Sequence, residues 1–269
     1  MAPMPSKRKI GVVAVAMAAM VVLAGIIIWG QGASATEAPL RVPILMYHYV
    51  DETPPDAGPH SADLTVPTAQ FEAEMDYLAA NGYHPVTLEE VYGAMAGKGW
   101  LPTKPVALTF DDGGLDNYTV AFPILQKHGF RATFFVITGS VGDPVCMDWE
   151  QLRVMHAAGM DIESHTVDHP DLRALDAARL AEELSRSRAV LATELGADSL
   201  ILAYPQGRYN GTVIVAAQAA GYLAAVTTRL WWTSSSPSRY EWQRTRVSPG
   251  ESLGAFGRAL EGARWWSIW

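Results

Sequence analysis

Two short segments of the sequence combine acidic and imidazole side chains in patterns that suit metal-assisted hydrolysis. Asp111 and Asp112 are adjacent and are followed by Gly113, while His165 and His169 lie four residues apart. Neighbouring residues of an extended segment point in opposite directions, so one aspartate can bind a cation while the other stays free as a base. Two histidines at this spacing suit one divalent ion, and a third ligand still leaves coordination positions open for water and substrate.

Each segment also has an ordinary structural interpretation. Asp-Asp-Gly is a common turn sequence, and a pair of histidines is often simply exposed to solvent. Cys146 is the only cysteine, which excludes a thiolate zinc cage and an intramolecular disulfide, and we expect it to be a small buried hydrophobe. The position of the segments along the chain decides between these interpretations.

The elements that must position these residues are short strands that alternate with helices. Runs typical of strands occur at residues 41–48, 105–110, 131–137, 160–164, 199–204, 222–228 and 243–247. Helical patterns with N-capping residues separate most of them, beginning after Thr87, Asp148, Asp176 and Asn210. This alternation predicts an α/β fold, a distorted (β/α) barrel of about seven parallel strands. Residues 51–67, rich in proline and glycine, are expected to form a long loop.

Active sites of such barrels form in the loops at the carboxyl ends of the strands. Asp111 and Asp112 follow the second expected strand, His165 and His169 follow the fourth, and residues 203–207 close the fifth. All of these segments are therefore expected on one rim, and this coincidence favours a functional site over unrelated turns.

The segments TFDDG (109–113), SHTVDH (164–169) and AYPQG (203–207), in this order and spacing, resemble the polysaccharide deacetylase family, the NodB homology domain of carbohydrate esterase family 4. The resemblance covers roughly residues 43–247. It implies that Asp112, His165 and His169 bind a divalent metal, commonly zinc, and that Asp111 is the general base. It also implies an oxyanion and substrate region at Tyr204, Pro205 and Gln206, with a backbone N–H near Gln206 as a donor.

The sequence departs from the family pattern at two places. Ala203 stands where many members have an arginine that orients the base. Either Arg244 or Arg246 on the last strand could replace it, and we expect Arg244 to do so. No histidine follows His169, although many members have a late histidine as general acid. His48, at the end of the first strand, is the residue we expect in that role, with simple packing in the rim as the alternative.

A pair of tryptophans is a candidate for contact with the substrate. Trp231 and Trp232 follow the sixth strand and are expected either to stack on sugar rings or to pack within their loop.

The chain has a net charge of −8, and leaving out the three cations Lys7, Arg8 and Lys9 gives −11 for residues 36–269. An acidic domain argues against nucleic-acid binding, and no obligate protein partner is evident.

The N-terminal sequence indicates in which cellular compartment the catalytic domain lies. Residues 1–9 are basic, and residues 10–30 form an uncharged apolar run that matches the thickness of a bilayer. We expect a transmembrane anchor, a linker over 31–40 and a catalytic domain over 41–269 outside the cytoplasm. The alternative is a signal segment cleaved near Ala35.

These observations together predict an extracytoplasmic, metal-dependent hydrolase. It is expected to remove N-acetyl groups from a polysaccharide of N-acetylhexosamine units. An O-acetyl esterase that acts on a polysaccharide such as xylan is one alternative, because an alcohol leaves more readily than an amine and depends less on a general acid. A catalytically inactive glycan-binding protein of the envelope is another.

Overall fold

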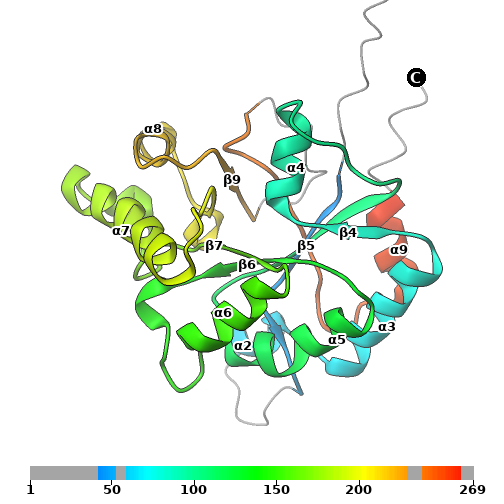
Figure 1. Cartoon of the computed structure of the whole chain (residues 1–269). Coiled ribbons are helices and arrows are strands. Elements are labelled where there is room, and N and C mark those ends of the chain that lie inside the picture. The colour runs from blue at the N-terminus through cyan, green and yellow to red at the C-terminus, as the bar shows by residue number, and fades with distance from the viewer. Residues whose placement is uncertain (1–41, 53–58, 229–237, 262–269) are drawn as a thin grey trace, which may run out of the picture. The chain divides into compact units, whose positions relative to one another are not determined.

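The computed structural model describes residues 42–52, 59–228 and 238–261, all within the compact unit Pro39–Trp269. Its centre is a curled sheet of seven parallel strands in the order β10–β1–β5–β6–β7–β8–β9 (Figure 1). The bounds are β1 Ile44–Tyr47, β5 Pro105–Phe110, β6 Thr133–Val136, β7 Asp161–Ser164, β8 Ile201–Ala203, β9 Ala224–Val226 and β10 Thr245–Arg246. A further strand, β4 (His84–Val86), pairs with the first half of β5. The prediction of an α/β fold with seven parallel strands is confirmed, in the form of a half-barrel.

The chain around Trp242 links the two ends of the sheet. Val226 of β9 forms a parallel bridge with Trp242, whose carbonyl accepts the Thr227 N–H at 2.8 Å. Three residues later the chain enters β10, which pairs with β1. One short segment therefore contacts β9 and then β1, and it encloses the interior of the curl.

Helices pack against both sides of this sheet, and the one that begins at Leu88 packs inside the curl, where Leu88 and Val91 join the cluster of Ile44 and Ala107. They are α3 Thr68–Ala80, α4 Leu88–Met95, α5 Phe122–Lys127, α6 Trp149–Ala157, α7 Ala177–Leu195, α8 Gly211–Ala219 and α9 Leu253–Glu261, with short turns η1 Asn117–Ala121, η2 Thr138–Ser140, η3 Leu172–Ala174 and η4 Pro205–Gly207. In Figure 1, α7 and α8 lie at one side of the sheet and α3, α5 and α9 at the other. The predicted N-caps are confirmed, because Thr87, Asp148, Asp176 and Asn210 each accept a backbone N–H of the following turn.

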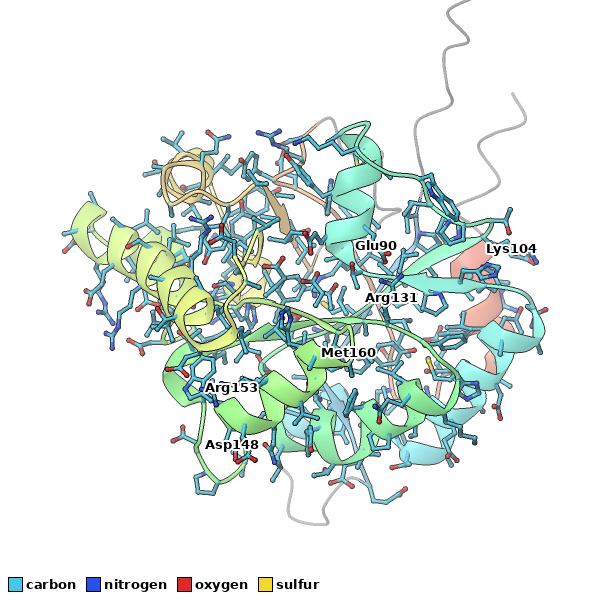
Figure 2. All side chains as sticks on the ribbon, in the orientation of Figure 1. Glu90, Lys104, Arg131, Asp148, Arg153 and Met160 are labelled. Carbon is cyan, nitrogen blue, oxygen red and sulfur yellow. The ribbon has the colours of Figure 1, made fainter. Side chains whose placement is uncertain are left out.

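Ion pairs on the surface connect α4 with the sheet. The Glu90 carboxylate accepts the Thr87 N–H at 2.9 Å and lies 2.6 Å from Arg131 Nη2, just before β6. Figure 2 shows these two labelled side chains next to each other above the sheet. Both are partly exposed, so we expect the pair to stabilise the fold by at most about 1 kcal/mol.

Both faces of the sheet are buried, and this explains the apolar strands. Ile44 and Ala107 belong to the apolar cluster inside the curl, whereas Leu108 and Phe110 belong to the cluster beneath α3, α5 and α6. Side chains of β5 thus alternate between interior and exterior. Asp111 continues the alternation, so its carboxylate enters the interior at the carboxyl end of the strands.

The expectation of a long loop over residues 51–67 is wrong in part. The structure has a helix, α2 (Pro59–Leu64), followed by β3 (Thr65–Val66), which pairs with β2 (Tyr49–Val50). Thr65 and Val66 are buried β-branched residues, and their pairing with the chain after β1 outweighs the local proline and glycine content. Residues 53–58 of the expected loop lie outside the described part.

Some sequence predictions fall on residues that the structure does not describe. The apolar segment 10–30 with its flanks 1–9 and 31–40, and also Trp231 and Trp232, lie outside the described ranges. Among the helices within those ranges, none combines the length and apolarity needed to cross a bilayer.

A buried carboxylate beneath β1 makes stability depend on pH. Glu74 of α3 is fully buried and accepts hydrogen bonds from Tyr47 Oη and Gln70 Nε2, both at 2.8 Å. Burial raises the pKa of Glu74 from 4.5 to about 7. Between these values the folded protein holds a proton that the unfolded chain releases, so this group's contribution to stability falls as pH rises.

We therefore expect the Glu74→Gln variant to gain stability relative to the wild type between about pH 5 and about pH 8. The comparison uses free energies of unfolding from urea titrations at both pH values. Glu72→Gln, a half-exposed position on the same helix, is the matched control and is expected to show no such trend. Parallel pH profiles for wild type and Glu74→Gln would contradict the assignment.

Candidate active site

Asp112, His165 and His169 converge at the carboxyl ends of β5 and β7. Each offers one ligand atom, and these atoms lie within 4.8 Å of one another. Asp112 Oδ1 is 3.6 Å from His165 Nε2 and 4.0 Å from His169 Nε2. The structure thus brings together the three residues that the sequence singled out as metal ligands. One carboxylate and two imidazoles form a donor set that suits Zn²⁺ and leaves open positions.

The protonation of the imidazoles fits this use. His165 Nδ1 lies 2.9 Å from the carbonyl oxygen of Ala203, which can only accept, so Nδ1 carries a hydrogen and Nε2 is the ring nitrogen that faces Asp112. Burial and the neighbouring His165 lower the pKa of His169, which favours its neutral form. The residues present therefore fit a divalent cation.

The local backbone at the site is strained. Five non-glycine residues in the described ranges have positive φ, and four of them lie in the three motifs: Asp112 (72°), Thr166 (70°), His169 (54°) and Gln206 (56°). Such conformations cost on the order of 1 kcal/mol or more each and cluster at functional sites. The surrounding contacts must hold these side chains in place.

Asp111 is held in the interior by Arg244. Nη1 and Nη2 of Arg244 donate to the two carboxylate oxygens at 2.6 and 2.7 Å, and both residues are at most 1% exposed. The guanidinium also donates to Thr109 Oγ1 and to the Thr227 carbonyl oxygen. Burial by itself would raise the pKa of Asp111, but Arg244 outweighs it and holds the pKa well below its usual range. Asp111 is therefore an ionised carboxylate beside the three ligands and is not one of them.

His48 lies on the rim next to Asp111. It follows β1, is 9% exposed, and has Nε2 4.0 Å from Asp111 Oδ2. Burial lowers the pKa of His48 and outweighs the opposing effects of Asp111 and Asp112. Its backbone oxygen accepts a hydrogen bond from Asn117 Nδ2 at 2.8 Å, which fixes the segment that carries the ring.

The tyrosine of the third motif lies in the core. The Tyr204 ring is fully buried against Tyr209 (4.9 Å between centroids), because Tyr204 continues the outward side of β8, and its N–H donates to the Val226 carbonyl. Pro205 is also buried. Gln206 is exposed, and within the described residues its N–H has no hydrogen-bond partner. The side chain of Tyr204 therefore belongs to the core, and Gln206 is the residue of this motif with a free donor.

Comparison with known proteins places this constellation in a family. The sequence pattern of the family named polysaccharide deacetylase matches residues 98–225. YxkH of Bacillus subtilis, whose name assigns it to the polysaccharide deacetylases, is 38% identical over 226 residues, 84% of this chain and 78% of that protein. This chain belongs to the polysaccharide deacetylase family. The resemblance recognised from the three motifs is confirmed, and with it the assignment to an enzyme family.

Two further relatives support the assignment of this deacetylase to the family. The deacetylase PplD of Streptococcus pyogenes, solved in complex with acetate, is 33% identical, and the match covers 83% of this chain and all of that one, with a TM-score of 0.77. The poly-β-1,6-N-acetyl-D-glucosamine N-deacetylase of Staphylococcus aureus is 28% identical over 172 residues. That match covers 58% of this chain and 59% of the staphylococcal protein.

A cleft of about 740 Å³ opens beside the candidate metal ligands. Its lining includes Asp112, His169, Tyr49, Asp116 and Val145. Tyr49, which the sequence analysis missed, donates from Oη to Asp112 Oδ2 at 3.0 Å and so leaves Oδ1 facing the histidines. The available signal was its place directly after His48 at the end of a strand.

The Asp111–Arg244 pair generates a prediction about stability. We expect Arg244→Gln to lower the free energy of unfolding by about 3–5 kcal/mol at pH 7, because it leaves a buried carboxylate without its cation. Adding Asp111→Asn to that variant removes the stranded charge and is expected to restore much of the loss. The measurement is a double-mutant cycle by urea unfolding. A loss below about 1 kcal/mol in the single variant would show that the pair is not buried as described.

Proposed function

We propose that this deacetylase removes N-acetyl groups from a polysaccharide of N-acetylhexosamine units. The observation that carries the proposal is the convergence of Asp112, His165 and His169 beside an ionised carboxylate, Asp111, that they leave free. The substrate class is supported by the relative from Staphylococcus aureus, whose name states N-deacetylation of poly-β-1,6-N-acetyl-D-glucosamine.

The proposed cofactor is a divalent cation, zinc by the chemistry of its donors. Asp112 Oδ1 and Nε2 of His165 and His169 would hold it. When bound, such a cation lowers the pKa of water at the site and polarises the acetyl carbonyl. The hydrogen bonds from Tyr49 to Asp112 and from His165 to the Ala203 carbonyl orient the ligands before the cation arrives.

Asp111 is proposed as the general base. Amide hydrolysis forms a bond between the water oxygen and the carbonyl carbon, breaks the bond to nitrogen, and moves one proton from water to the departing amine. Both carboxylate oxygens of Asp111 accept from Arg244, which orients the group and keeps it ionised. Arg244 is a positioning residue in this scheme. The N–H of Gln206, which has no hydrogen-bond partner within the described residues, is the proposed donor to the oxyanion of the tetrahedral intermediate.

His48 is proposed as the general acid. A carboxylate with a depressed pKa does not keep a proton, and the imidazole Nε2, 4.0 Å from Asp111 Oδ2, is a nearby group that can take it up. His48 is neutral before the reaction because burial lowers its pKa, so it can receive this proton and pass it to the amine. This path explains how the chain can act without a histidine after His169.

The remaining proposals concern the polymer and the compartment. The cleft beside the ligands is proposed to hold sugar units next to the reacting one, with Trp231 and Trp232 as further stacking residues. Because such polymers are envelope glycans, we propose that the domain works outside the cytoplasm, anchored by residues 10–30 or released by cleavage near Ala35. Digestion of a C-terminal tag by protease added to intact protoplasts supports this location, and full protection of the tag refutes it.

Acetate release tests the reaction and its substrate. The purified full-length chain is expected to release acetate from N-acetylglucosamine oligomers, to lose this activity with a zinc chelator and to regain it when zinc is added. Asp112→Ala should lose bound zinc and activity together, whereas Asp111→Asn should keep zinc and lose about 10²-fold or more in kcat. Release from acetylated xylan alone would replace this proposal with an O-acetyl esterase. No release from any acetylated glycan, with zinc present, would support a binding protein.

A separate experiment tests the acid. His48→Ala is expected to lower kcat by about 10²–10⁴-fold with unchanged zinc content, because the amine then leaves without its proton donor. His84→Ala is the matched control, since His84 is exposed on β4 and its Nδ1 hydrogen-bonds to the Thr103 carbonyl oxygen. A near-normal rate in His48→Ala would remove this residue from the mechanism.

A further inference from the structure

The turn between His165 and His169 rests on a carboxylate from a different element. Glu183 of α7 is fully buried, and its Oε2 accepts the backbone N–H groups of Val167 and Asp168, both at 3.0 Å. These are two of the three residues that join the histidines. Its other oxygen, Oε1, lies 2.9 Å from Arg179 Nη2.

The charge of Glu183 is therefore compensated on both sides. A buried carboxylate is costly unless it is paired and hydrogen-bonded. Here two N–H groups donate to Oε2, and Oε1 forms an ion pair with the guanidinium but has no hydrogen-bond partner among the described residues. Arg179 also pairs with the Asp168 side chain, so helix and turn are connected twice. Consecutive N–H groups in a turn of this kind form a concave anion site, and Glu183 occupies it.

The turn needs such support because its backbone is strained. Thr166 and His169 both have left-handed φ, at 70° and 54°. Neutral groups satisfy the rest of the turn: Thr166 Oγ1 accepts the His169 N–H at 3.1 Å, and the Val167 carbonyl accepts the Gly139 N–H at 2.9 Å. Glu183 supplies the charged acceptor, and without it two N–H groups would lose their partners.

We infer that Glu183 is a positioning residue for the candidate metal centre: by holding the Val167–Asp168 backbone, it keeps His165 and His169 at the spacing that one cation requires. The inference rests on the proposed metal-dependent function and extends it to a residue on α7 that binds the backbone between the two histidines. A merely structural Glu183 would affect only stability, whereas a positioning Glu183 also sets the affinity for metal.

The test measures zinc affinity and stability separately. Zinc dissociation constants are obtained for the purified full-length protein by competition with a chromophoric chelator, and stability by urea unfolding of the metal-free protein. Glu183→Ala is expected to weaken zinc binding by about 10–100-fold, as is typical when a partner that orients metal ligands is lost. Glu183→Gln keeps an uncharged acceptor and is expected to fall between Glu183→Ala and the wild type.

Glu182→Gln is the matched control. Glu182 is the preceding residue, pairs with the same Arg179 and is half exposed, so its replacement makes the same change in charge without touching the turn. We expect wild-type zinc affinity in this variant. If Glu183→Ala does not fold, Glu183→Gln decides the question, with a several-fold weaker affinity expected.

Wild-type zinc affinity in a folded Glu183→Ala or, failing that, Glu183→Gln protein would overturn the inference and leave the proposed function intact. Zinc binding by the wild type that does not depend on Asp112 would overturn the proposed metal site as well. The two failures are therefore distinguishable in one set of titrations.

Discussion

The buried ion pair between Asp111 and Arg244 is the interaction on which the site depends. It joins residues 133 positions apart, from the strand that carries the first motif and from the chain entering the last strand. Arg244 reaches Asp111 only because the segment from Trp242 to β10 crosses from β9 to β1 and encloses the interior. A buried pair of this kind contributes little net stability, but removing either partner strands a charge. Asp111 is therefore paired and held in place only when the sheet has its native curl.

Asp111 and Asp112 have different proposed roles, base and metal ligand, because the strand geometry points them in different directions. Asp111 keeps the inward direction of Thr109, where the interior supplies Arg244, while Asp112 adopts a left-handed conformation and faces the histidines. The turn of the second motif is strained as well, and two of its backbone N–H groups donate hydrogen bonds to Glu183. Contacts with buried residues thus hold the metal-binding side of the site in place.

Much of this arrangement could be predicted from the sequence. The seven strands followed from apolar runs separated by capped helices, and the meeting of Asp112, His165 and His169 followed from the rule that parallel strands end at one rim. A cation from the last strand was predictable because the third motif lacks its arginine, but only the structure decides between the two candidates, with Arg244 buried and Arg246 exposed.

The rest depends on tertiary contacts that local patterns do not encode. Tyr204 faces the core because β8 sets its direction, and the pairing of β2 with β3 replaces part of an expected loop. Tyr49 is visible only once its hydroxyl is seen to contact Asp112. Glu183 had a weak signal, since it lies on the same helical stripe as Leu180, Leu184, Ser187 and Leu191, but an acidic residue in a helix is ordinarily read as exposed.

The most direct measurement of the central claim is anomalous diffraction at the zinc edge from crystals of the zinc-loaded protein. The account predicts one ion bound by Nε2 of His165, Nε2 of His169 and a carboxylate oxygen of Asp112, at about 2.0–2.2 Å, with Asp111 still paired to Arg244. An ion that takes Asp111 as a ligand, or the absence of any ordered ion between these three side chains, would contradict it.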